Sequence, residues 1–151
     1  MDNSHDVTVT NTLIATTLDS MKGYADAAEN SENSTHQQFF REMSEERSQV
    51  ASDLQAHVRS LGGDPETDSS TAGAVHRGWL DLKTAVTGRG EEGIVSEVER
   101  GEDYIKAKFE TAMQDDELSA GTRGALEKCF ASVRRGHDRA SQMKHAMAHA
   151  D

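Results

Sequence analysis

The stretch that most constrains the fold is residues 91–113, because its apolar side chains repeat at the spacing of one helix face. The inward positions step alternately by three and four residues, as in a helix packed inside a bundle. They are Val95, Val98, Glu102, Ile105, Phe109 and Ala112. Only Glu102 is polar. A carboxylate on such a face must be paired, protonated, hydrated or bound to another group, so the surroundings of Glu102 are the central question.

Three other segments carry similar stripes, and the sequence therefore predicts four long helices. We expect them over about residues 7–30, 34–61, 91–113 and 119–147. Ser34 and Gln37 fit a capping box, and Gly62, Gly63 and Pro65 predict a stop. The other predicted inward positions are Ile14, Leu18, Met21, Ala25 and Ala28, then Phe39, Met43, Glu46, Val50, Leu54, His57 and Leu61, then Leu126, Phe130, Val133, His137, Ala140, Lys144 and Met147.

The long connection between the second and third helices bears on the topology. It contains a shorter apolar pattern (Val75, Trp79, Leu82 and Val86) that ends at Gly88. A helix of this kind can return along the bundle, which leaves the second and third helices parallel; the alternative is a helix packed across one end. The predicted fold is all-α and one domain over residues 1–151. It is a ferritin-like four-helix bundle of two antiparallel hairpins with a long helical crossover.

Charge and composition exclude several classes of protein. The formal net charge is −11, and the 16 Lys and Arg are scattered among 27 Asp and Glu. Nucleic-acid binding and docking on anionic membranes both need clustered cations, so we expect neither. No basic leader precedes an apolar run, and no stretch reaches membrane-spanning length. A single cysteine, Cys129, cannot form an internal disulfide, which favours a cytoplasmic location.

Polar residues at the predicted inward positions suggest a metal site. Glu46, Glu102 and His137 are expected at one level of the bundle, with Glu99 one turn away. Di-iron bundles need Glu-x-x-His pairs, but none of the seven histidines has a Glu three residues before it. A mononuclear site for iron or another divalent transition metal remains possible on ligand type.

The simpler interpretation is structural, and we favour it. In it, Glu102 and His137 form a buried hydrogen bond, with Arg47 or Arg134 neutralising the remaining charge. Cys129 is expected to be a buried structural thiol rather than a nucleophile. No cofactor is required by this interpretation.

Several ordered motifs resemble one known family. They are Gly23-Tyr24, the segments at residues 61–66, 74–83 and 99–103, and His137-Asp138. Between about Leu13 and Met143 the chain resembles a bacterial family of ferritin-like four-helix-bundle proteins of unknown function. The resemblance implies a ferritin-like bundle, and the positions that carry over are Glu99, Glu102 and His137.

Two hypotheses about function follow. The first is a non-catalytic, cytoplasmic bundle that acts as a scaffold or stress-related interaction protein and self-associates, for example as a dimer. The second is a metal-binding protein with a redox or storage role, in which Glu102 and His137 bind the metal and Glu46 or Glu99 completes the site. An enzymatic activity is expected only under the second hypothesis.

Overall fold

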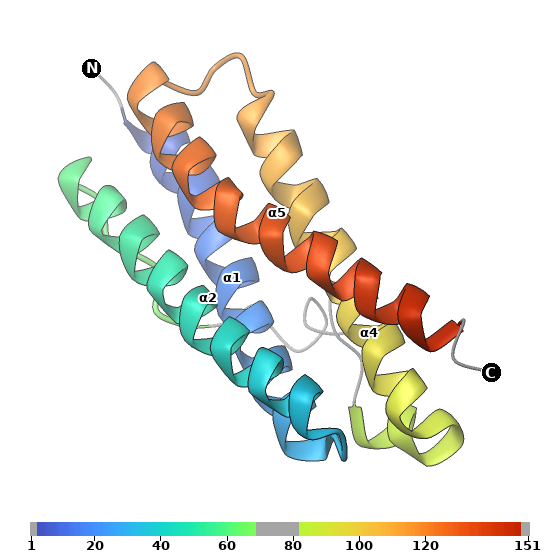
Figure 1. The fold of residues 1–151 in the computed structure, drawn as a ribbon. Helices are drawn as coiled ribbons and strands as arrows, with labels where there is room; N and C mark the ends of the chain where they lie inside the picture. Colours follow the sequence, from blue (N-terminus) through green and yellow to red (C-terminus); the bar gives the residue numbers. More distant parts are fainter. Residues whose placement is uncertain (1–2, 69–81, 149–151) are drawn as a thin grey trace.

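The structure, a computed structural model, describes residues 3–68 and 82–148, and this part of the chain is helical without strands. The helices are α1 (Ser4–Asn30), α2 (Ser34–Ser60), α4 (Leu82–Met113) and α5 (Ala120–Ala148). They lie side by side as a four-helix bundle (Figure 1). The predicted all-α class and the predicted number of long helices are confirmed.

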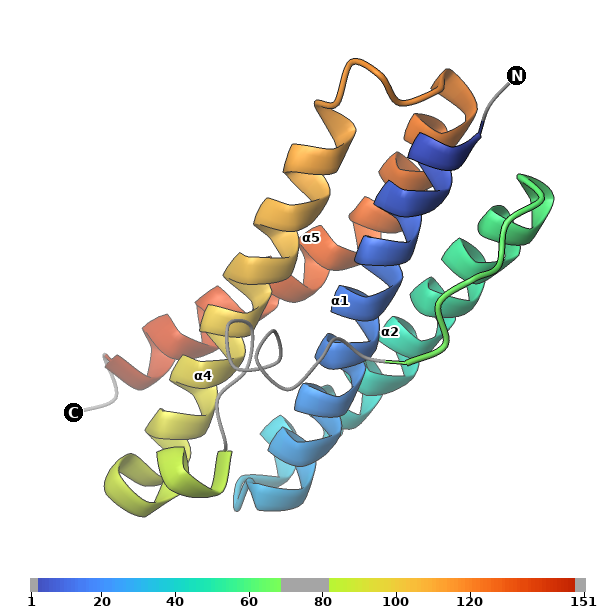
Figure 2. The same ribbon diagram turned by 180° about the vertical axis from the view of Figure 1, so that it is seen from behind.

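The helices form two antiparallel hairpins, α1–α2 and α4–α5 (Figures 1 and 2). Helix α1 packs against α2 and α4, and α5 packs against α4 and α2. Helices α2 and α4 therefore occupy opposite corners, and they run in the same direction, as the sequence suggested. Residues 69–81, including Val75 and Trp79 of the expected crossover helix, lie outside the described residues.

Helix α4 starts before the predicted third helix and is interrupted once. At Gly90 the backbone has φ 61° and ψ −137°, which is not helical. Positive φ is accessible to glycine at little cost, so the chain can change direction here. The residue after the break, Glu91, ties α4 to the α1–α2 turn. Its carboxylate accepts hydrogen bonds from Ser31 Oγ (2.7 Å), Glu32 N (3.0 Å) and His36 Nδ1 (2.6 Å).

The ends of α2 differ in how well the sequence predicted them. The expected cap at Ser34 is wrong by one residue: Asn33 is the N-cap, and its side chain accepts a hydrogen bond from His36 N at 3.0 Å. Asn33 has the extended backbone that an N-cap adopts. The stop at the other end is confirmed, because α2 ends at Ser60 and Gly62 has a φ of 81°.

The buried positions of α4 are the predicted ones. In the other three helices, some buried positions differ from the predicted ones. All six predicted positions of α4 are buried. In α1, Ala25 is exposed, and Ser20 and Tyr24 are buried instead. In α2 the central inward residue is Arg47 rather than Glu46. In α5, Lys144 is exposed, and Gly136 takes the place expected for His137.

Apolar side chains fill the bundle in two clusters, one toward each end. The first contains Leu13, Ile14, Val50, Leu54, Val58, Ile105, Phe109, Ala112, Leu118, Leu126, Cys129 and Val133. The second contains Tyr24, Ala27, Ala28, Phe39, Phe40, Met43, Ile94, Val95, Val98 and Ala140. Within the described residues, no helix combines the length and apolar character needed to cross a membrane.

Candidate functional site

A fully buried ion pair joins α2 and α4, which occupy opposite corners of the bundle. Arg47 of α2 donates to Glu102 of α4 through Nη1–Oε1 (2.7 Å) and Nη2–Oε2 (2.8 Å). Both side chains have no exposed area. The parallel two-bond geometry matches a guanidinium to a carboxylate and is the strongest form of such a pair. Each oxygen of Glu102 is thus already bound to a cation.

The other two helices complete the surroundings of this pair. From α1, Ser20 Oγ accepts a hydrogen bond from Arg47 Nη1 at 2.7 Å. The ring centre of Tyr24, also on α1, lies 5.5 Å from Arg47 Cζ, within range of a cation–π interaction. From α5, Gly136 lies against the pair. A Cβ at Gly136 would lie 2.5 Å from Arg47 Nη2 and 2.7 Å from Glu102 Oε2.

The electrostatic environment keeps Arg47 charged. Burial is the largest single effect and would lower the pKa of Arg47, but the negative charge and hydrogen bonds of Glu102, together with smaller effects of Tyr24 and Glu46, outweigh it, and the pKa of Arg47 is raised. Burial and then the negative charge of Glu102 raise the pKa of Tyr24 well above its ordinary value, so the phenol stays neutral. Taking two charges out of water is costly, and the attraction within the pair opposes that cost.

The expected contact between Glu102 and His137 is not formed. His137 Nε2 lies 2.7 Å from Asp103 Oδ1, and the imidazole side chain is 19% exposed. The error has a simple cause. Gly136 faces the core, so His137 points about 100° away around the helix, toward the surface of α4. Glu102 pairs with Arg47, one of the two arginines expected to neutralise its charge.

The other two predicted metal ligands, Glu46 and Glu99, also contact separate neighbours. Glu46 accepts hydrogen bonds from Ser132 and, at 2.7 Å, from Arg135 of α5. Glu99 accepts one from Lys144 at 2.9 Å. The four residues proposed as metal ligands thus take part in four different contacts. Among the residues that the structure describes, no three His, Cys, Asp or Glu side chains form a group able to hold a metal ion.

The chemistry of the centre does not fit a transition metal. Such a site needs deprotonated or neutral donors that face one point. The bundle centre instead holds a guanidinium, which is a cation and cannot donate a lone pair. Both oxygens of Glu102 are turned toward that guanidinium.

Gly136 is the residue that sequence reasoning missed at this site, whereas Arg47 was expected as one of two arginines that could neutralise Glu102 but was not placed on the inward face of α2. A signal for Arg47 was present: Met43 precedes it by four residues and Val50 follows it by three, and both are buried. Arg47 therefore continues an apolar stripe at the same period that we read for Glu102. Gly136 left no comparable signal, since a glycine adds no apolar side chain to a stripe.

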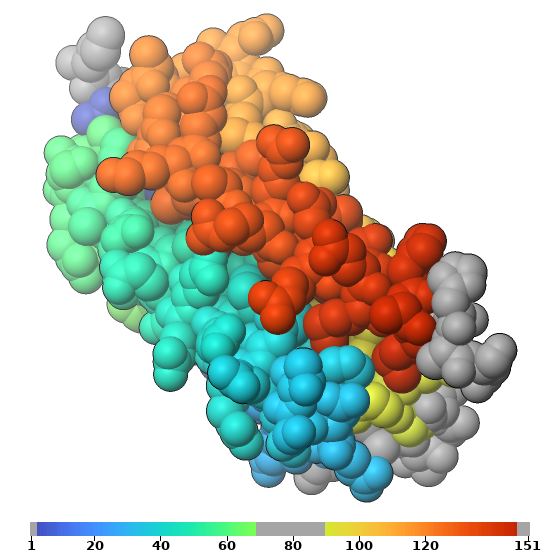
Figure 3. Space-filling view, viewed as in Figure 1, coloured from blue at the N-terminus to red at the C-terminus, as the bar shows by residue number. Residues whose placement is uncertain are grey.

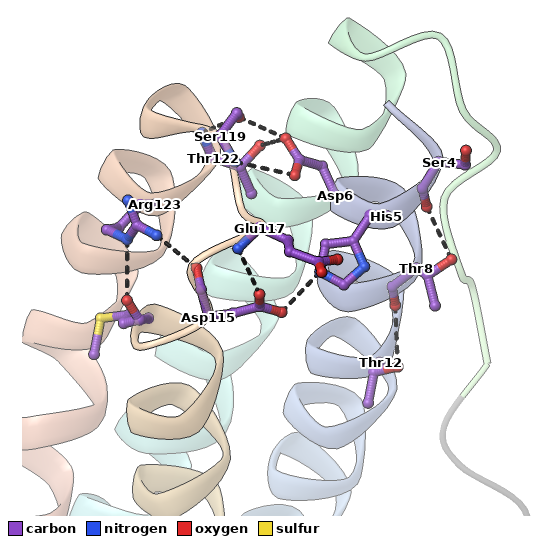
Figure 4. Close-up of polar contacts among 11 residues, drawn as sticks. Ser4, His5, Asp6, Thr8, Thr12, Asp115, Glu117, Ser119, Thr122 and Arg123 are labelled. Atoms are coloured by element: carbon purple, nitrogen blue, oxygen red, sulfur yellow. Dashed lines mark hydrogen bonds and ion pairs between the residues drawn. The ribbon is translucent and has the colours of Figure 1, made fainter. Parts of the chain in front are cut away.

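A second polar network lies at the end of the bundle where α1 begins (Figure 4). The buried Asp6 of α1 accepts hydrogen bonds from Ser119 N (3.2 Å), Ser119 Oγ (2.5 Å) and Thr122 Oγ1 (2.9 Å). Desolvation raises the pKa of Asp6, but these hydrogen bonds outweigh it and lower the pKa below its ordinary value. Nearby, His5 Nε2 lies 2.7 Å from Asp115 Oδ2. These contacts join α1 to the α4–α5 turn.

Comparison with known proteins identifies the family. A sequence model described as Domain of unknown function (DUF2383) matches residues 6–115. The chain belongs to this DUF2383 family. The match includes Arg47 and Glu102 and ends before α5, so Gly136 lies beyond it. No curated protein matches the chain.

Proposed function

We propose that this DUF2383 protein is a non-catalytic, ferritin-like helical bundle that acts as a scaffold or stress-related interaction protein. The ferritin-like part of the proposal is supported by the two antiparallel hairpins and by the parallel course of α2 and α4. The motifs at residues 61–66 and 99–103, which resemble a bacterial ferritin-like family, point the same way.

One observation carries the non-catalytic part: the Arg47–Glu102 pair fills the centre of the bundle. In metal-dependent bundles, carboxylates and imidazoles of facing helices meet at the centre around the ion. Here the inward carboxylate is neutralised by a guanidinium, both side chains have no exposed area, and Gly136 closes the fourth side. The pair joins opposite corners of the bundle, which is a structural role.

Metal analysis of protein purified without a His tag tests this proposal. We expect far less than one equivalent of any transition metal, and no change in metal content in His137→Ala. His137→Ala is the informative variant, because this side chain lies at the surface and its loss should leave the fold intact. A stoichiometric transition metal that is lost in both His137→Ala and Glu102→Gln would refute the proposal.

The metal-binding alternative remains a prediction that the same experiment decides. It assigns iron or another divalent metal to Glu102 and His137, with Glu46 or Glu99. No contact among the described residues favours it, since each of these four side chains is engaged by a different neighbour.

We further propose a cytoplasmic location and self-association. The location is supported by Cys129, which is buried and whose pKa burial raises to about 11, as expected of an inert reduced thiol. Sedimentation equilibrium over a range of concentrations tests self-association, and a strictly monomeric protein would refute it.

A further inference from the structure

A hollow of about 290 Å³ lies where the first turns of α2 face the last turns of α5. Figure 3 shows these two segments side by side, with α2 in light blue and the end of α5 in red. Three side chains with nitrogen or sulfur donors line the hollow: His36 of α2, and Met143 and Met147 of α5. We call them the His–Met set. The described lining does not include Arg47 or Glu102, so this place is separate from the bundle centre.

The helix period brings the two methionines together. Residues four apart lie on the same face of an α-helix, one turn above the other. Met143 and Met147 have this spacing, and both are partly buried against the apolar cluster that contains Phe39. Their thioethers therefore belong to one hollow, and partial burial restrains them from turning freely into solvent.

A carboxylate orients the imidazole of His36. His36 Nδ1 lies 2.6 Å from Glu91 Oε2, and the His36 side chain is 14% exposed. Desolvation raises the pKa of Glu91, but hydrogen bonds from Ser31, His36 and Glu32 outweigh it and lower the pKa, so the carboxylate is an acceptor. The neutral imidazole then carries its proton on Nδ1 and its lone pair on Nε2. Histidines that bind metals are commonly held by such a second contact.

The donors of the His–Met set are of a kind that copper accepts. Within the described residues, His36 Nε2 has no hydrogen-bond partner. Thioether sulfur is a soft donor that selects Cu⁺, and imidazole nitrogen is also a good ligand for copper. A set of this composition differs from the groups of His, Cys, Asp and Glu, none of which occurs among the residues that the structure describes.

The charges of the hollow suit a monovalent ion. Its described lining contains one arginine, Arg139, and one carboxylate, Glu91, and their formal charges cancel. The guanidinium of Arg139 lies over the ring of Phe39, with Cζ 4.9 Å from the ring centre. Hard divalent ions such as Mg²⁺ and Ca²⁺ need several oxygen ligands, which these lining residues do not supply. A soft, singly charged ion has no such requirement.

We propose that His36, Met143 and Met147 form a binding site for Cu⁺. The site goes beyond the proposed function, because it adds a ligand at one end of a bundle whose centre is filled by an ion pair. The hollow is open to solvent at the exposed Ala146, so a bound ion exchanges with a chelator in the purification buffer. The metal content of protein purified in this way reports on the bundle centre, and added Cu⁺ reports on the hollow.

Titration of the intact protein with Cu⁺ under anaerobic, reducing conditions tests the proposal, with a chromophoric Cu⁺ chelator as competitor. We expect one ion per chain. Met143→Leu and Met147→Leu each remove one sulfur but keep an apolar side chain of similar volume, so the fold should be retained. Each should weaken binding at least about tenfold, and His36→Gln, which removes the nitrogen donor, should do the same.

Matched controls make the same chemical changes away from the hollow. Met113 is partly buried against the other apolar cluster, and His145 is an exposed residue of α5 that is not among the described lining residues. Because these positions are independent of the His–Met set, we expect Met113→Leu and His145→Gln to change binding by no more than about twofold. Circular dichroism confirms that every variant is folded.

A second measurement locates the ion in the unaltered chain. Ag⁺ is a soft ion of the same charge that is not oxidised in air, and NMR of methyl-labelled methionine reports on each thioether separately. On addition of Ag⁺, the methyl signals of Met143 and Met147 should shift, whereas those of Met21 and Met113 should not.

Three outcomes would overturn the proposed copper site. They are failure to bind one Cu⁺ per chain, equal effects of the hollow and control variants, and Ag⁺ shifts that leave the methyl signals of Met143 and Met147 unchanged. Binding that His36→Gln leaves intact would also overturn it, by removing the nitrogen from the His–Met set. The Ag⁺ measurement needs no variant, so it decides the question even where a variant fails to fold.

Discussion

Arg47 of α2 and Glu102 of α4 form a two-bond ion pair across the diagonal of the bundle, at 2.7 and 2.8 Å, with neither side chain exposed. Diagonal helices do not otherwise pack closely in this arrangement. The pair thus connects elements that the apolar interfaces leave apart, and it is the contact from which most of the following predictions are drawn.

Removing one partner of this pair should be strongly destabilising. Arg47→Met leaves the carboxylate of Glu102 buried without a counter-charge, which costs about 3–5 kcal/mol of unfolding free energy. The double variant Arg47→Met, Glu102→Leu should recover most of that loss, because Arg47 Nε is already buried without an acceptor among the described residues. Urea denaturation measures both. Equal losses in the single and double variants would contradict this account of the pair.

His137 should be energetically independent of Glu102. The structure pairs His137 with Asp103, whose side chain is largely exposed, so His137→Leu should cost no more than about 1 kcal/mol. Double-mutant cycles measured by urea denaturation test the partner. We expect measurable coupling between His137 and Asp103 and, within about 0.5 kcal/mol, none between His137 and Glu102. Strong coupling to Glu102 would restore the pairing first expected from the sequence.

Replacing Gly136 by alanine should destabilise the protein although alanine favours helices. The new Cβ would lie 2.5 Å from Arg47 Nη2 and 2.7 Å from Met43 Cε. The guanidinium cannot move away without losing Glu102, so we expect a net cost of about 1–3 kcal/mol. Gly124→Ala on the same helix is the matched control, since nothing lies within 4 Å of its Cβ position. It should stabilise by up to about 1 kcal/mol. Thermal denaturation of the two variants should shift the midpoint in opposite directions.

Asp6 should make stability depend on pH in the acid range. Its folded-state pKa lies below the ordinary value of 3.8, so its contribution is fully present above that value. It is lost as the pH falls through the lower folded-state pKa. At about pH 6, Asp6→Asn should lose about 1–3 kcal/mol, and the difference from wild type should shrink below about pH 3. A difference that is the same at both pH values in urea denaturation would contradict this role.

Cys129 should react slowly with thiol reagents while the protein is folded. Burial raises its pKa to about 11, so very little thiolate is present near neutral pH. We expect slow labelling by Ellman's reagent under native conditions and fast labelling in urea. Fast labelling of the folded protein would show that the thiol is accessible and activated.

The spacing of apolar residues was sufficient to predict which side chains are buried where those residues all lie on one helix face. In residues 91–113 the predicted inward positions are all buried, because apolar residues repeat there with little ambiguity. The stop after α2 and the two hairpins also follow from local signals such as Gly62. The break before this segment lies at Gly90, two residues after the Gly88 expected to end the preceding helix. The connection through residues 69–81 lies outside the described residues.

Tertiary structure decided which of the candidate partners Glu102 contacts. Neighbouring residues in a helix are about 100° apart, so the stripes on α2 and α5 admit either Glu46 or Arg47, and either Gly136 or His137. Spacing within one helix cannot choose between such neighbours, because the choice depends on what the facing helices present. When α2, α4 and α5 pack together, the space left by Gly136 admits the guanidinium of Arg47, and Glu102 is neutralised from the opposite corner. The sequence by itself therefore determined that an inward carboxylate needed a partner and offered His137, Arg47 and Arg134 as candidates. The packing of four helices determined that the partner is Arg47 and that His137 does not take part.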